Sequence, residues 1–241
     1  MFAEGIKLYN QTKVMSSIYQ QVLGSEFQKL HPQIQKRFGF NSNDKIASIG
    51  KGIMQSVWYG KPYTLPFLYV GTWRNIMFPQ KGKDVSFTIE NYAYKDKFGR
   101  ETVTWVRKYQ FPNRERRFDA TMIYSEKRKR IVDYLGTHQH LAVDIEMAVA
   151  ENGGLRLHSG EQRFYEGIFG FKFPMIFSGE ANVCEWFDDK EQKFKISVVV
   201  GNKTWGKLFG YEGTFETEYI PVNSIADIPK DVLPKREEIR E

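Results

Sequence analysis

The spacing of apolar residues divides the chain into a short helical start and a long region of alternating character. Over residues 16–24, Ser17 suits the N-cap of a helix and Gly24 suits its end. Pro32 fits the first turn of a second helix over 32–38, where its missing N–H costs nothing. The pattern therefore predicts an N-terminal helical segment.

From residue 46 the period changes to two, which is typical of strands with one buried face. Residues 141–149 show the alternation most clearly. A cap-like Thr64 and Pro79 bound a short helix predicted within 64–79, and 166–177 is interpreted as an aromatic connector. The predicted strands are 46–60 (with Ile49, Ile53 and Val57 on one face), 85–94, 101–111, 117–126, 141–149, 155–165, 179–189, 193–200 and 209–220.

These elements predict a single α+β domain, mainly β, over residues 16–220. We expect about ten mostly antiparallel strands in a barrel or a strongly curved sheet, because closure removes the exposed edges that so many strands create. Residues 1–15 are interpreted as an N-terminal extension. The segment 221–241, with three prolines and many charges, is predicted to be a polar, solvated tail.

Composition favours a globular β protein with aromatic side chains available to line a cavity. The 241 residues include 19 Phe, 13 Tyr and 5 Trp, and the 35 Lys/Arg against 29 Asp/Glu give a net charge of +6. A basic stretch over 107–130 divides between two predicted turns about 30 Å apart. We interpret these residues as solvated turns rather than a nucleic-acid footprint, since no nucleic-acid-binding module is visible.

The single cysteine, Cys184, allows no intrachain disulfide, which fits a reducing compartment. The start of the chain lacks the apolar core of a signal peptide, and no apolar run is long enough to span a membrane. We therefore expect a cytoplasmic protein without a membrane span.

Two glycine motifs resemble nucleotide-binding loops, but each lacks a residue that nucleotide binding requires. Gly201, Gly206 and Lys207 have P-loop spacing, but Leu208 replaces the hydroxyl that would hold magnesium and a strand follows. At 50–55, Gln55 stands where a dinucleotide fingerprint needs its third glycine. No cofactor is predicted.

His138 and His140 lie two residues apart and form a candidate metal pair, with His158 or Asp144 as a conceivable third ligand. Their parity, however, is that of Asp144 and Glu146 on the polar face. We interpret them as surface histidines and predict no metal site.

A charged residue on an apolar strand face is the most informative feature. Arg107 shares its parity with Trp105 and Tyr109, so its guanidinium must be paired or must face a cavity. Glu161 and Arg163 share parity with Leu157, unless Gly160 introduces a bulge.

Two interpretations of this charged cluster remain open. It is either a buried salt-bridge network or an anchor for the polar end of a largely apolar ligand. In the second case the ligand-binding residues would be Arg107, Glu161 and Arg163, with Trp105, Tyr109 and Trp186 as walls.

The segments 65–79, 87–112, 116–145, 150–167 and 209–215 resemble the bacterial family called domain of unknown function 4166. The resemblance runs from Ser16 to Tyr219, and its most family-like motif joins Trp105, Arg107 and Tyr109. It implies no reaction. Some relatives are joined to a nicotinamide-dinucleotide-binding domain, which implies a possible separate dehydrogenase as partner.

The function predicted from these observations is binding of a small, partly apolar, anionic ligand inside a barrel. An enzyme that uses the same cavity, working with a separate NAD(P)-dependent dehydrogenase, is the alternative. A module that binds nucleic acid or protein through a basic rim is the least favoured hypothesis.

Overall fold

A computed structural model describes residues 16–174 and 178–241, so the predicted extension 1–15 lies outside the described residues. The chain begins with α1 (Ile18–Leu23), a 3-10 helix (Gly24–Lys29) and α2 (Pro32–Gly39), which confirms the helical start. Ser17 caps α1 reciprocally with Gln20, as each side chain accepts a hydrogen bond from the other residue's backbone N–H.

In the described residues, eleven strands form one antiparallel sheet, in the order β6-β5-β4-β3-β2-β1-β11-β10-β9-β7-β8. An additional β6–β7 pairing joins the two sides, so ten strands close into a barrel and only the short β8 lies beyond it. The predicted barrel is thereby confirmed. The strands are β1 (Ile46–Tyr59), β2 (Gly82–Lys95), β3 (Glu101–Phe111), β4 (Arg114–Ser125), β5 (Arg130–Leu135), β6 (Leu141–Val149), β7 (Leu155–Glu166), β8 (Phe169–Lys172), β9 (Glu180–Asp188), β10 (Lys193–Asn202) and β11 (Gly206–Pro221).

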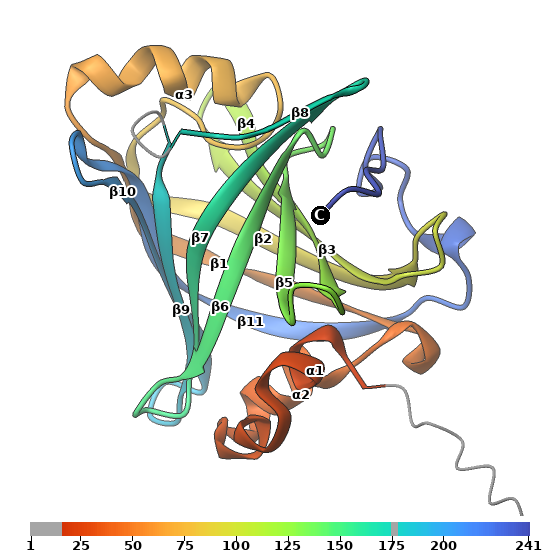
Figure 1. The fold of residues 1–241 in the computed structure, drawn as a ribbon. Coiled ribbons are helices and arrows are strands. Elements are labelled where there is room, and N and C mark those ends of the chain that lie inside the picture. The colour runs from red at the N-terminus through yellow and green to blue at the C-terminus, as the bar shows by residue number, and fades with distance from the viewer. Residues whose placement is uncertain (1–15, 175–177) are drawn as a thin grey trace, which may run out of the picture.

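The two ends of the barrel are covered differently (Figure 1). The helix α3 (Leu65–Thr72) lies in the β1–β2 connection at one end, which we call the α3 end, together with the β7–β8 hairpin and the β10–β11 turn. The helices α1 and α2 cover the opposite end. Within the described ranges, no helix is both long and apolar enough to cross a membrane.

The prediction that Ile49, Ile53 and Val57 share a buried face is wrong. β1 has one more residue than β11 between the pairs Ile53–Thr214 and Ser56–Glu212. This bulge reverses the alternation, so Val57 faces the barrel interior while Ile49 and Ile53 face outward.

The predicted solvated tail is also wrong. Ile49, Tyr92, Tyr94 and Val106 form an apolar stripe on the outer wall of the barrel, and residues of the C-terminal segment cover it. The covering side chains are Val222, Ile228, Val232 and Leu233. This cover stabilises the fold, because the free energy falls when apolar surface is removed from water.

Candidate functional site

The barrel encloses a cavity of about 440 Å³ that reaches the α3 end. Trp105 of its lining donates a hydrogen bond from Nε1 to the Tyr19 hydroxyl of α1 at 2.8 Å. The apolar side chains Leu68, Ile76, Met77, Trp105, Phe118, Met122, Leu135, Leu141, Val143, Ile145, Leu157, Ala181, Val183, Val198, Val200 and Leu208 make up most of the lining. Such a cavity suits a small ligand with a large apolar part.

Arg107 brings a positive charge into this apolar cavity and is only 4% exposed. Its Nε donates to the Phe118 carbonyl at 3.1 Å, and its Nη1 donates to the Tyr211 hydroxyl at 3.2 Å. The guanidinium carbon lies 3.9 Å from the centroid of the Phe118 ring. Among the described residues, no carboxylate oxygen lies within 4.0 Å of the guanidinium. All of its close partners are therefore neutral.

Asp133 on β5 is the second ionisable residue of the cavity. Burial raises the pKa of its carboxyl to about 7, although the charge of Arg107 and a backbone hydrogen bond from Thr121 both favour ionisation. One carboxyl oxygen, Oδ1, is buried without a hydrogen-bond partner among the described residues. The cavity thus contains a permanent cation and a carboxyl that changes its charge near neutral pH.

We expect Asp133→Asn to change how stability depends on pH. The folded pKa of about 7 lies above the ordinary 3.8, so burial stabilises the neutral form, and this advantage is lost as the pH rises toward 7. Relative to the variant, the wild type should lose about 1 kcal/mol of unfolding free energy per pH unit between about pH 5 and 7. Urea unfolding at several pH values measures this, and parallel profiles for the two proteins would contradict it.

Three of the predicted site residues lie together, on β3. Arg107 and Trp105 line the cavity. Tyr109 also points into the barrel but is fully buried, and its ring contacts Phe78, Phe87 and Tyr211 at centroid distances of 5.0–5.2 Å. Tyr109 therefore packs beneath the site rather than facing its open space.

The placement of Glu161 and Arg163 inside the barrel is wrong. β7 carries one more residue than β6 between the pairs Val143–Gln162 and Ile145–Ser159, so the bulge at Gly160 is present. The bulge turns both charged side chains to the outer wall and brings Gln162 to the cavity, whereas Ser159, before the bulge, keeps the inward parity of Leu157.

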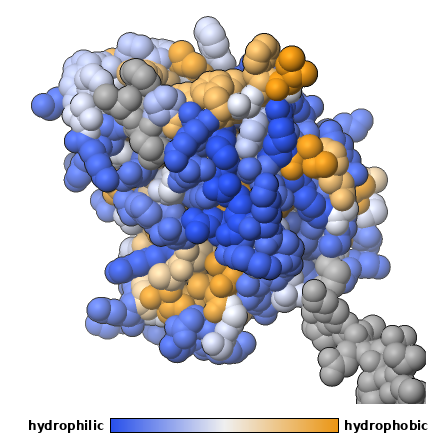
Figure 2. All heavy atoms as spheres, in the orientation of Figure 1, coloured by the Kyte–Doolittle hydropathy of each residue, from blue (hydrophilic) through white to orange (hydrophobic). Residues whose placement is uncertain are grey.

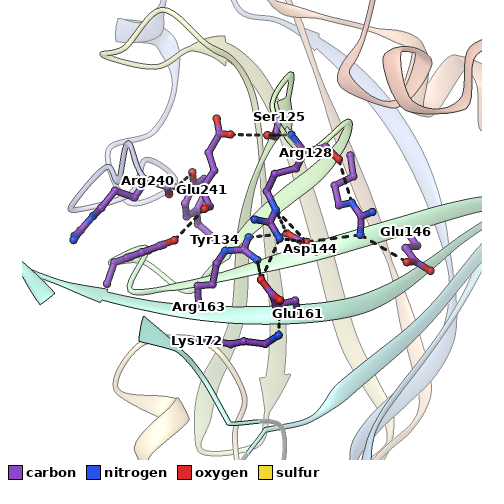
Figure 3. A network of polar contacts seen from close by, with 12 residues as sticks. Ser125, Arg128, Tyr134, Asp144, Glu146, Glu161, Arg163, Lys172, Arg240 and Glu241 are labelled. Carbon is purple, nitrogen blue, oxygen red and sulfur yellow. Dashed lines mark hydrogen bonds and ion pairs between the residues drawn. The ribbon is translucent and has the colours of Figure 1, made fainter. Parts of the chain in front are cut away.

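On the outer wall, Glu161 and Arg163 join an ion-pair network around Asp144 (Figure 3). The Asp144 carboxylate accepts hydrogen bonds from Arg163 Nη2 and Arg128 Nη2 at 2.6 Å each. Lys172 Nζ contacts the Glu161 carboxylate at 2.6 Å. Hydrogen bonds from the Lys172 ammonium lower the pKa of the Glu161 carboxyl to about 2. The network joins strands β6 and β7 to the β4–β5 turn and β8, which is a structural role.

Trp186 is also misplaced by the prediction. On β9 the side chains of Ala181 and Val183 line the cavity, and Glu185 and Phe187 continue the same inward parity. Trp186 has the opposite parity and lies on the outer wall beside Gly154, where a Cβ would come within 2.8 Å of the Trp186 Cβ. It cannot contact a ligand in the cavity.

Sequence reasoning missed Asp133, Ser159 and Gln162. A signal for Asp133 was present, because it alternates with Ile131 and Leu135 and is thus a lone acid on an apolar face. Ser159 likewise shares the inward parity of Leu155 and Leu157, whereas Gln162 had no such signal because it reaches the cavity only through the bulge at Gly160.

The basic stretch 107–130 is mostly neutralised by its neighbours. Lys127 and Lys129 are exposed as predicted, but Arg128 and Arg130 are partly buried and contact Asp144. At the other turn, Arg117 pairs with Asp119 and Asp231. The stretch is therefore largely structural.

His138 and His140 stack at a centroid distance of 5.7 Å in the β5–β6 connection. His140 pairs with Glu166 at 2.7 Å and contacts Arg236 of the C-terminal segment, so both rings are partly covered rather than fully solvent-facing. In the part of the chain that the structure describes, no three potential ligands are grouped as a metal site would require.

Fold and cavity together define a closed antiparallel β-barrel whose apolar cavity is lined, among the described residues, by one arginine and one aspartate. The chain belongs to the family described as domain of unknown function (DUF4166), which matches residues 30–215. It is 34% identical over 206 residues to uncharacterized protein YndH of Bacillus subtilis (strain 168), a match that covers 85% of this chain and 98% of that protein. No solved structure gave a significant match.

Proposed function

We propose that the protein binds a small, amphipathic anion in the barrel cavity, with the negative group at Arg107 and the apolar part along the wall. One observation carries this proposal: a buried guanidinium faces an apolar cavity, and its hydrogen-bond acceptors among the described residues are all neutral. A buried charge without a counterion costs free energy, and a ligand carboxylate would supply the missing partner.

Asp133 is compatible with this ligand. At a pH below about 7 its carboxyl is largely protonated, so it can donate a hydrogen bond to an anion instead of repelling it. This contact would use Oδ1, which has no hydrogen-bond partner among the described residues. We therefore expect binding to weaken as the pH rises above 7, where Asp133 becomes ionised.

The test compares two ligands that differ only in the head group. Isothermal titration with dodecanoate and with dodecanol, at pH 6 and pH 8, separates the charged contact from the apolar one. We expect dodecanoate to bind more tightly than dodecanol, with a smaller difference at pH 8. Equal affinities would remove the anionic part of the proposal, and no binding of either would remove the cavity part.

A catalytic use of the same cavity is the second candidate, and Asp133 is the observation in its favour. A carboxyl with a pKa of about 7 can both accept and donate a proton at neutral pH, as general acid–base catalysis requires. A separate NAD(P)-dependent dehydrogenase would then supply the substrate or consume the product. Mass spectrometry of a ligand retained through purification tests this. The wild-type protein would alter that ligand chemically during incubation, and the Asp133→Asn variant would not.

A further inference from the structure

A surface rich in apolar side chains surrounds the mouth of the cavity at the α3 end, and we call it the α3 patch. Trp73 is 82% exposed and Ile168 is 91% exposed, although side chains of this size are usually buried. In Figure 2, hydrophobic and intermediate colours gather on this upper end of the molecule. Its members are Tyr63, Phe67, Tyr69, Val70, Trp73, Ile168, Phe169, Phe171 and Trp205.

The positive charges beside the α3 patch form no ion pairs with described residues, although Asp84 follows Lys83 directly and Glu166 lies in the β7–β8 hairpin. Segments 60–83 and 201–207 together contain six Lys/Arg and no Asp or Glu. None of the six lies within 4.0 Å of a carboxylate oxygen of the described residues. These cations are Lys61, Arg74, Lys81, Lys83, Lys203 and Lys207.

Several basic residues at the opposite end of the barrel, in contrast, form ion pairs. There four lysines form ion pairs at 2.7–3.0 Å, namely Lys29 with Glu26, Lys95 with Glu101, Lys129 with Glu126, and Lys195 with Asp188. Lys127 at the opposite end forms no ion pair with a described residue either, so what distinguishes the α3 end is the combination of six unpaired cations with a group of exposed aromatic side chains.

The α3 patch is continuous with the cavity. Tyr63, Phe67, Val70 and Trp205 belong to the lining of the cavity and are exposed on the outer surface as well. A surface that covers the α3 patch would therefore also cover the mouth through which a ligand enters or leaves.

We propose that the α3 patch docks on an anionic lipid bilayer. Aromatic side chains insert at the level of the lipid head groups while Lys and Arg attract the anionic ones, and this combination produces interfacial binding without a span. The bilayer is then the source or destination of the amphipathic ligand. That last step rests on the proposed function, whereas docking itself does not.

Co-sedimentation of the full chain with vesicles tests docking. We expect binding to vesicles of phosphatidylcholine with phosphatidylglycerol, weakening as salt increases, and at least about tenfold weaker binding to phosphatidylcholine alone. Lys61→Glu with Lys203→Glu should lower the affinity by about tenfold or more. The matched control, Lys127→Glu with Lys129→Glu at the opposite end, should leave it within about twofold.

A second pair of variants tests the apolar contact without touching the cavity. Tyr69→Ser and Trp73→Ser lie in the α3 patch but outside the cavity lining, so they should reduce vesicle binding and leave dodecanoate affinity unchanged. Ile239→Ser, at an exposed site in the C-terminal segment, is the control. Vesicle binding that ignores lipid charge, or self-association that Trp73→Ser abolishes in the absence of vesicle binding, would overturn the proposal. Loss of dodecanoate binding alone would overturn only the proposed function.

Discussion

Arg107→Met is expected to lower the affinity for dodecanoate by about ten- to a hundredfold while the barrel remains folded. A hydrogen-bonded charge pair in a buried site contributes about 1.5–3 kcal/mol, which corresponds to that loss. Methionine retains much of the side-chain volume, so the cavity should not collapse. Because the guanidinium has no carboxylate within 4.0 Å among the described residues, its removal leaves no broken ion pair behind.

Two comparisons isolate the effect of the charge. Dodecanol should bind Arg107→Met and wild type alike, since it has no negative group to lose. Arg156→Met, on an exposed outward-facing position of β7, makes the same chemical change outside the cavity and should leave both affinities unchanged. If Arg107→Met instead destabilises the fold by several kcal/mol with dodecanoate binding intact, Arg107 is structural and the anchor hypothesis is wrong.

Arg37→Met is expected to cost about 3–5 kcal/mol of unfolding free energy. Arg37 on α2 forms an ion pair with Glu185 on β9, and both side chains are fully buried. Its Nη1 also donates to the Ser48 hydroxyl at 2.8 Å. Substitution would leave the Glu185 carboxylate buried without its counterion, in a site where its Oε2 has no hydrogen-bond partner among the described residues. Urea unfolding measures the loss.

A surface pair provides the control. Lys29→Met breaks the exposed Lys29–Glu26 pair and should cost less than about 1 kcal/mol, because solvent screens such pairs. Arg37→Met with Glu185→Leu should recover much of the stability, since the stranded charge is gone. An Arg37→Met protein as stable as wild type would show that this pair does not hold α2 to the barrel.

The local elements of this protein follow from its sequence because their causes are local. The cap at Ser17, the proline in the first turn of α2 and the alternation over 141–149 each depend on residues within a few positions of one another. The number of strands and the need to remove sheet edges then favour a barrel. The basic charge of the chain, in contrast, does not indicate a binding surface. Arg128 and Arg117 form ion pairs with acidic residues on other segments of the chain, Asp144 and Asp231.

Which face a side chain takes after a bulge was decided only by the tertiary structure. The bulges at Gly160 and between Ile53 and Ser56 are defined by the pairing of β7 with β6 and of β1 with β11, in which one strand has one residue more than its partner. Each moved the residues that follow to the opposite face, which excluded Glu161 and Arg163 from the cavity. The same applies to the cover of the outer stripe by the C-terminal segment and to the distance between Arg107 and any carboxylate. Alternation along one strand encodes two faces, but only pairing between strands determines which of them is inside.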